Sequence, residues 1–198
     1  MTYVFSDITI SIDGFAAGLG QTAQKPFGDG PVQELHRWMF EEPESNAAEI
    51  AAVATAEAFV MGRNMFGPDR GELDPNWAGW WGPNPPYHGP VFVLSHHKRE
   101  PLVMDGGTTF TFVNEGIDAA LEQAKAAAGP EGRVSIAGGA STVNQYLRAG
   151  SIDELRTHIA PVILGEGERL LLDVPARTVS IVSARASALA THITYRIS

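Results

Sequence analysis

Apolar residues along the first two thirds of the chain fall into short strand-like runs separated by stretches with helical spacing. Strands are expected near residues 3–10, 58–61, 90–95, 108–113 and 134–137. Helices are expected near residues 32–40, 46–56, 116–128 and 141–148. Strands that alternate with helices usually pair in parallel, so this part predicts a largely parallel sheet with helices on both faces.

The pattern changes from Glu154 onward, where three strands are expected near residues 154–164, 178–184 and 188–197. Alternation of apolar and polar residues is clearest in the last of them, T-H-I-T-Y-R-I. These strands predict an antiparallel edge on the same sheet. The expected fold is α/β: one three-layer α/β/α domain over residues 1–198, with a mixed, mostly parallel sheet of about eight strands.

Composition narrows the class of protein. The 198 residues include no cysteine, which excludes disulfides, thiolate metal sites and a cysteine nucleophile and fits a reducing compartment. The formal charge of −9, from 14 basic and 23 acidic side chains, argues against nucleic-acid binding. No run is apolar enough to span a bilayer, and the histidines lack metal-ligand spacing. We therefore expect a cytoplasmic protein without a metal, a membrane or a nucleic acid as partner.

Ligand-binding chemistry recurs directly after three of the predicted strands. The segments are M-G-R-N-M (61–65), L-S-H-H-K-R (94–99) and A-G-G-A-S-T (137–142). Ligands of open α/β sheets bind beyond the carboxyl ends of the strands. The double glycine at 138–139 alone fits either a tight turn or a phosphate site at a helix start. The recurrence at neighbouring strands favours a phosphate-binding rim.

Five segments together resemble the dihydrofolate reductase-like fold family, over nearly the whole chain. They are S-I-D-G-F (11–15), V-M-G-R-N-M-F (60–66), V-F-V-L-S-H (91–96), I-A-G-G-A-S-T-V-N-Q-Y-L (136–147) and I-D-E-L-R-T-H-I-A-P-V-I-L-G-E-G (152–167). The closer resemblance is to the reductase domain of bacterial riboflavin-biosynthesis deaminase-reductases. It implies an oxidoreductase that uses NADPH, and it implies a homodimer, which the exposed edge of the C-terminal strands also favours.

The resemblance assigns parts of NADPH to particular residues. It places Gly62, Arg63 and Asn64 at the phosphates, Ser95 and His96 at the adenosine 2′-phosphate, Gly138, Gly139, Ala140, Ser141 and Thr142 at the pyrophosphate, and Asp13 and Gly14 beside the nicotinamide. A 2′-phosphate dianion favours a cationic partner, Arg63 or a protonated His96, with Lys98 or Arg99 nearby. NADPH is therefore expected rather than NADH.

The catalytic candidates are Glu34 and Asp13. Glu34 resembles the helix carboxylate with which dihydrofolate reductases hold the pterin ring, although a glutamate there also stabilises a helix dipole. Trp38 and Phe40 are expected in the core. The segment 18–23 is expected to be a loop over the nicotinamide. The loop 77–88 is expected to be a substrate lid, with a subunit contact or packing on its own domain, the commoner outcome for such tryptophans, as the alternatives. The acidic, alanine-rich insertion 41–58 has no assigned role.

Three functions follow from these residues. The first is an NADPH-dependent reductase of a pterin, folate-like or ribosylamino-pyrimidine substrate. The second is the 5-amino-6-(5-phosphoribosylamino)uracil reductase of riboflavin biosynthesis, which would need a further basic residue beside the nicotinamide. The third is a nucleotide-binding module without turnover. In each case the partner is a small heteroaromatic molecule or nucleotide.

Overall fold

A computed structural model describes residues 1–68 and 73–198, and its strands form one sheet in the order β4-β5-β3-β2-β6-β1-β7-β9-β8. The strands are β1 (Tyr3–Ser11), β2 (Ala58–Gly62), β3 (Pro90–Leu94), β4 (Leu102–Val103), β5 (Thr109–Val113), β6 (Arg133–Gly138), β7 (Glu154–Ala160), β8 (Val179–Ala186) and β9 (Thr191–Ile197). The helices are η1 (Val32–His36), α1 (Arg37–Phe40), α2 (Ala47–Val53), α3 (Arg63–Phe66), η2 (Asp105–Gly107), α4 (Ile117–Ala128) and α5 (Ala140–Arg148).

The sheet is mixed, as the sequence predicts. The six strands from β5 to β7 pair in parallel, whereas β9 is antiparallel to β7 and β8 is antiparallel to β9. The other edge is also antiparallel, because β4 pairs with β5. With two residues, β4 is too short to show an alternating pattern, and the sequence did not predict it.

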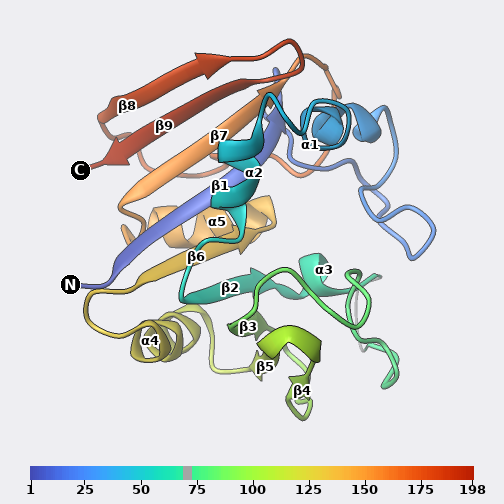
Figure 1. The fold of residues 1–198 in the computed structure, drawn as a ribbon, viewed down its shortest axis with the longest axis vertical. Helices are drawn as coiled ribbons and strands as arrows, with labels where there is room; N and C mark the ends of the chain where they lie inside the picture. The colour runs from blue at the N-terminus through green and yellow to red at the C-terminus, as the bar shows by residue number, and fades with distance from the viewer. Residues whose placement is uncertain (69–72) are drawn as a thin grey trace.

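Different segments pack on the two faces of the sheet. Alternate β2 residues point to opposite sides: Val60 joins the core beneath α4 and α5, whereas Phe59 and Met61 join an aromatic cluster on the other side. That second side is covered by the loop after α3 and, over β1 and β7, by the segment from η1 to α2 (Figure 1). The predicted three layers are confirmed, with a long loop forming part of one layer.

Two elements and one residue differ from the expectation. The helix expected at 32–40 begins as the 3-10 turn η1 and continues as the single turn α1. The strand expected at 154–164 ends at Ala160, because Pro161 has no N–H for the ladder. Phe40 is wrong as a core residue, since its side chain is 77% exposed at the end of α1, whereas Trp38 is fully buried as predicted.

The tryptophan-containing loop mainly serves the core. Trp81 lies in the aromatic cluster with Tyr87 and Phe110, and Trp77 donates from Nε1 to the carbonyl of Phe66. Trp80 instead lines the hollow at the end of the sheet. A substrate-lid role for the loop therefore rests on Trp80 alone. No helix in the described ranges has both the length and the apolar character needed to cross a membrane.

Candidate functional site

The three glycine- and serine-containing turns lie together at one edge of the sheet. Strands β3, β2 and β6 are consecutive neighbours, with Gly62 paired to Leu94 and Met61 to Gly138. A Cβ atom on Gly62 would collide with Thr142 Oγ1 and would lie 3.6 Å from the carbonyl oxygen of Gly138. The turn after β2 therefore touches the first turn of α5, and Ser95 follows directly on the next strand. This confirms the predicted convergence of the turns.

The start of α5 presents free donors at this edge. Gly139 is the N-cap, its carbonyl accepts the N–H groups of Thr142 and Val143, and the preceding Gly138 has a φ of +124° that only glycine adopts readily. The Gly138–Gly139 peptide bond is cis. Within the described chain, no backbone hydrogen bond is made by the N–H groups of Gly139, Ala140 or Ser141. Donors of this kind at a helix N-terminus are suited to an anion, and the predicted pyrophosphate contact at 138–142 stays a prediction.

Arg63 is turned toward its own loop. Its Nη1 donates to the carbonyls of Pro68 at 2.6 Å and Gly67 at 3.3 Å. The guanidinium thus shapes the segment after α3, and its predicted contact with a phosphate stays a prediction. Asn64 is exposed and lines the hollow beyond the strand ends.

The turn after β3 is held by Ser95. Its Oγ accepts the N–H of His97 and donates to the His97 carbonyl, while Asn114 Nδ2 donates to the Ser95 carbonyl. His96 and Lys98 remain exposed on this turn. They are the basic side chains that the turn offers to a phosphate.

Arg99 is not available to the cofactor phosphate, contrary to expectation. Its guanidinium lies over the rings of Phe66 and Phe112 and donates to the carbonyls of Pro75 and Trp77. Burial lowers the pKa of this group. Arg99 therefore fixes the tryptophan-containing loop to the sheet.

Asp13 joins the loop after β1 to a distant turn. Its Oδ1 accepts the N–H of Leu164 at 3.1 Å, and its Oδ2 accepts that of Gly165 at 2.7 Å. Together with a hydrogen bond from Ser11, these donors lower the pKa of Asp13 to about 2. The carboxylate stays ionised at neutral pH and is a positioning group, next to Gly14 with its open, positive-φ backbone.

Glu34 lies on η1 and is occupied by a neighbour. Its Oε2 accepts Arg37 Nη1 at 2.8 Å, and about half of its side chain is exposed (47%). Arg37 is held on its other side by Glu41. The predicted contact between Glu34 and a pterin ring stays a prediction.

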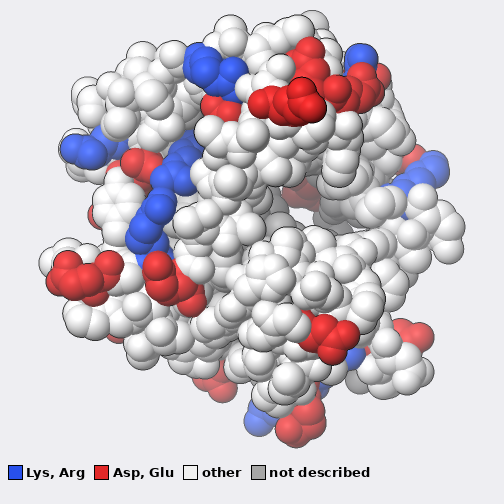
Figure 2. All heavy atoms as spheres, viewed as in Figure 1, with Lys and Arg blue, Asp and Glu red and all other residues white. Residues whose placement is uncertain are grey.

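A hollow of about 240 Å³ opens at the same end of the sheet. Leu19 and Pro26 line it from the loop after β1, Asn64 and Trp80 line it from the opposite side, and Glu168 contributes a carboxylate. Figure 2 shows the molecule hollowed on the right of the view, the end toward which β2 and β6 point in Figure 1. The loop 18–23, expected over the nicotinamide, therefore does border this opening.

Two further features lie near this end. Glu168 belongs to the turn L-G-E-G-E (164–168), which the family resemblance places near the substrate, and its side chain lines the hollow. The ring of His36 packs at a tilt against that of Phe27, with 4.6 Å between ring centroids, and burial, with His158 nearby, lowers the pKa of His36 to about 4. In the described ranges, no group of three or more His, Cys, Asp or Glu side chains is placed to hold a metal ion.

The chain matches a family model and a curated sequence relative. The RibD C-terminal domain model matches residues 2–195. A curated relative, the uncharacterized protein YyaP of Bacillus subtilis (strain 168), is 36% identical over 66 residues, which are 33% of this chain and 34% of that protein. The match thus spans about a third of that relative.

Solved structures share the fold across the entire chain. A putative riboflavin biosynthesis protein from Shewanella sp. PV-4 is 21% identical with a TM-score of 0.63, and 99% of it is covered. Acinetobacter baumannii RibD is 14% identical with a TM-score of 0.61, and 58% of it is covered. A Thermotoga maritima diaminohydroxyphosphoribosylaminopyrimidine deaminase/5-amino-6-(5-phosphoribosylamino)uracil reductase is 13% identical with a TM-score of 0.57, and 57% of it is covered.

Proposed function

This chain belongs to the RibD C-terminal domain family, and from that premise we propose that it is an NADPH-dependent reductase of a ribosylamino-pyrimidine or a related pterin-like compound. The family assignment supports an oxidoreductase, and the choice of cofactor and substrate is our proposal. The main structural support for this proposal is the contact between the turn after β2 and the start of α5.

The residues at this contact fit a dinucleotide pyrophosphate. A pyrophosphate needs close approach of backbone N–H groups, and Gly139, with no atom within 4 Å of an added Cβ, permits it, while Gly62 lets the turn after β2 pack directly on Thr142. Gly138 to Thr142 would hold the pyrophosphate, and Gly62, Arg63 and Asn64 would meet the neighbouring phosphates. Gly14, with no atom within 4 Å of an added Cβ, would leave room for the nicotinamide.

NADPH is preferred over NADH in this proposal because of the turn after β3. His96 and Lys98 are exposed there, and Ser95 holds the turn in place. A 2′-phosphate dianion would gain charge-assisted hydrogen bonds from them, whereas the 2′-hydroxyl of NADH would not.

When bound, NADPH supplies the hydride, and the chain supplies position and electrostatics. Asp13 accepts the N–H groups of residues 164 and 165, so it would keep together the two loops that we propose to border the nicotinamide. Neither catalytic candidate is well placed as an acid, because Asp13 is ionised and Glu34 is paired with Arg37. We therefore propose that ordered water delivers the proton.

Turnover tests this function directly. Oxidation of NADPH is measured at steady state with dihydrofolate and, separately, with the deaminated pyrimidine precursor of riboflavin. Turnover of the pyrimidine precursor supports the riboflavin-pathway reading, and turnover of dihydrofolate alone supports a pterin reductase. NADPH binding with no turnover of either would contradict the reductase and leave a nucleotide-binding module.

We also propose a homodimer. The edge strand β8 is exposed along its full length, and it presents large apolar side chains: Val179, Ile181 and Val182. An exposed apolar edge strand is a site for pairing with another chain, and closed two-fold pairing is the commonest way to cover it. We place this dimer in the cytoplasm, the reducing compartment that a cysteine-free chain fits.

A further inference from the structure

Helix α2 stands away from the sheet that it covers. None of its residues is buried, although a surface helix normally buries an apolar stripe. A cavity of about 570 Å³ lies between them, with Ala48, Ala51 and Ala52 on the helix side and, on the other, charged residues of β1, β6, β7 and β8 together with polar and apolar residues of β9. Figure 2 shows basic side chains in a line down the left of this face, flanked by acidic ones.

This cavity is separate from the proposed cofactor cradle, by which we mean the turns after β2, β3 and β6 at the carboxyl ends of the strands. Toward the carboxyl ends of the strands, the fully buried Trp38 donates to Thr9 Oγ1 at 3.3 Å and lies 4.5 Å from the ring of His158. The tryptophan thus covers the strand positions between the cavity and the glycine turns. The hollow at the cradle shares no lining residue with this cavity within the described chain.

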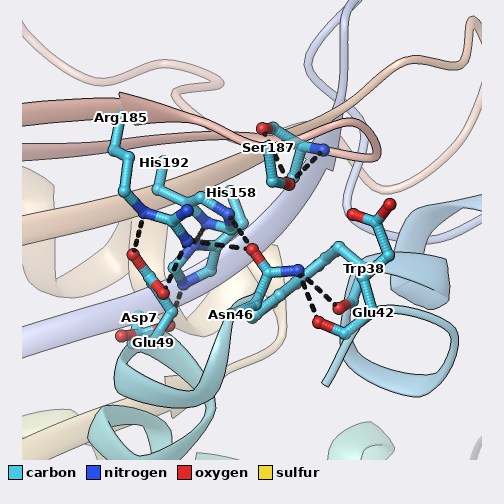
Figure 3. A network of polar contacts seen from close by, with 10 residues as sticks. Asp7, Trp38, Glu42, Asn46, Glu49, His158, Arg185, Ser187 and His192 are labelled. Atoms are coloured by element: carbon cyan, nitrogen blue, oxygen red, sulfur yellow. Dashed lines mark hydrogen bonds and ion pairs between the residues drawn. The ribbon is translucent and has the colours of Figure 1, made fainter. Parts of the chain in front are cut away.

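The end wall of the cavity is a chain of hydrogen bonds whose directions can be assigned (Figure 3). Asn46 Nδ2 donates to the carbonyls of Trp38 and Glu42, so Asn46 Oδ1 is left as an acceptor. His192 Nε2, 3.0 Å away, must therefore donate to it. Burial, with His158 nearby, lowers the pKa of His192 to about 4, so this ring is neutral at pH 7 and its Nδ1 is an acceptor.

These assignments fix the charge of the next pair. His158 Nδ1 lies 2.6 Å from His192 Nδ1 and must donate to it. His158 Nε2 lies 2.6 Å from Asp7 Oδ1, and that contact needs a second proton, on either the ring or the carboxyl group. In both cases Asp7 and His158 together carry no net charge.

The other charged side chains of the cavity form ion pairs with no net charge, except for one cation. Arg156 pairs with Glu154 at 2.6 Å, and Arg185 pairs with Glu49 at 2.8 Å. Arg133 has no ion pair in the described part of the chain; its guanidinium lies 4.6 Å over the Phe5 ring. Glu57 accepts only the backbone N–H of Arg133. The wall therefore offers one uncompensated positive charge.

A buried acceptor stands at the other end of the cavity. Asp7 is 3% exposed at its side chain, yet its Oδ2 accepts no hydrogen bond, and Arg156 Nη1 lies 3.8 Å away. Phe5 and Asp7 lie two residues apart on β1 and point to the same face, and the guanidinium of Arg156 also lies over the Phe5 ring, at 4.4 Å. The unpaired cation and the unpaired acceptor are thus carried by two separate residues of the cavity wall, Arg133 and Asp7.

We propose that the cavity beneath α2 binds a small aromatic monoanion. Its acid group pairs with Arg133, its ring lies against the alanine face of α2, and an O–H or N–H at the opposite end donates to Asp7 Oδ2. The volume lies within the range of small-molecule sites. This ligand is distinct from the substrate and cofactor of the proposed reductase.

Calorimetric titration with three probes tests the two ends of the site. The probes are 4-hydroxybenzoate, benzoate, which lacks the donor, and 4-hydroxybenzyl alcohol, which lacks the acid. We expect one 4-hydroxybenzoate per chain, with binding at least about tenfold weaker for each of the others, since each loses a charge-assisted hydrogen bond. NADPH at saturation should leave the affinity unchanged.

Two pairs of variants locate the binding. Arg133→Gln removes the cation, with Arg148→Gln on the exposed end of α5 as its control. Ala52→Phe fills the cavity from α2, with Ala47→Phe, which does not line it, as its control. Arg133→Gln and Ala52→Phe should each weaken binding at least tenfold while circular dichroism shows a folded protein. No binding at millimolar probe, competition with NADPH, or equal binding by all four variants would overturn the proposal.

Discussion

Gly62 is the residue on which the cofactor cradle depends most. A methyl group at this position would collide with Thr142 Oγ1 and press the turn after β2 away from α5. We expect Gly62→Ala to lower NADPH affinity at least tenfold and to destabilise the fold by about 1–3 kcal/mol, the usual cost of overpacking. Isothermal titration and chemical denaturation measure the two effects.

A second substitution makes this prediction specific. Thr142→Ala removes the hydroxyl that the new methyl group would meet, so Gly62→Ala/Thr142→Ala should recover most of the stability lost by Gly62→Ala. Thr142→Ala alone is the control. A single variant Gly62→Ala with wild-type stability and NADPH affinity would show that the two turns are not in contact.

A substitution at Glu34 distinguishes two possible proton donors, water and the Glu34 carboxyl group. If water delivers it, as the ion pair with Arg37 favours, Glu34→Gln should change kcat by less than about fivefold. A general acid at this position would contribute about 10²–10⁴-fold. Steady-state kinetics with the substrate that turns over decides between them, and a loss of a hundredfold or more would restore Glu34 as the acid.

Buried histidines predict sensitivity to acid. The pKa values of His36 and His192 are lowered to about 4 in the folded protein, from 6.5 in an unfolded chain, mainly because burial disfavours the charged ring. Since the unfolded chain binds these protons more readily, stability is fully present above pH 6.5 and is lost as pH falls through 4. Each buried group accounts for on the order of 3 kcal/mol.

Thermal unfolding between pH 7 and 4 tests this. His36→Phe keeps an aromatic ring against Phe27 and removes one titrating group, so its Tm should fall less over this range than that of the wild type. His97→Phe, at an exposed position, is the control and should follow the wild-type curve. Parallel curves for all three proteins would contradict the assignment.

At the scale of elements, regular strands and the turns that follow them could be predicted from sequence. The runs around β2, β3 and β6 are apolar and bounded by glycine or serine, so both their positions and the shared edge of their turns follow from pattern and parallel pairing. Short elements were not predicted: α3 has four residues and β4 has two, and segments of this length show no periodicity.

The hydrogen-bonded chain of Asp7, His158 and His192 could not be predicted. Asp7 and His158 are 151 positions apart, and only the register of β1 against β7 brings them together. The pairing of His158 with His192 likewise depends on the register between β7 and β9. The position of Arg99 could not be predicted either, because it donates to carbonyls of a loop that has no regular structure.

Strand β8 carries the prediction for assembly. A charge in the middle of its apolar row should prevent pairing, so Ile181→Glu is expected to shift the protein from dimer to monomer in sedimentation equilibrium. Val103→Glu, at a position that is also apolar and exposed but lies on the opposite edge strand β4, should leave the dimer intact. A wild-type monomer at micromolar concentration would contradict the proposal.

At the scale of the whole molecule, the sheet order places three turns from distant parts of the chain at one edge, and the proposed function depends on that placement. The family assignment and this geometry are both consistent with a nicotinamide dinucleotide, and the preference for its 2′-phosphorylated form is part of the proposal. Neither the charged cavity beneath α2 nor the exposed β8 edge is needed for that ligand to bind.

The most direct test is the stability of the purified protein with each nicotinamide cofactor. NADPH at a hundredfold excess over its dissociation constant should stabilise the fold by about 2.7 kcal/mol, and NADH at the same concentration should stabilise it clearly less. Replacing His96 and Lys98 with glutamine should narrow this difference. Equal stabilisation by both cofactors would contradict the 2′-phosphate site, and no stabilisation by either would contradict the cradle itself.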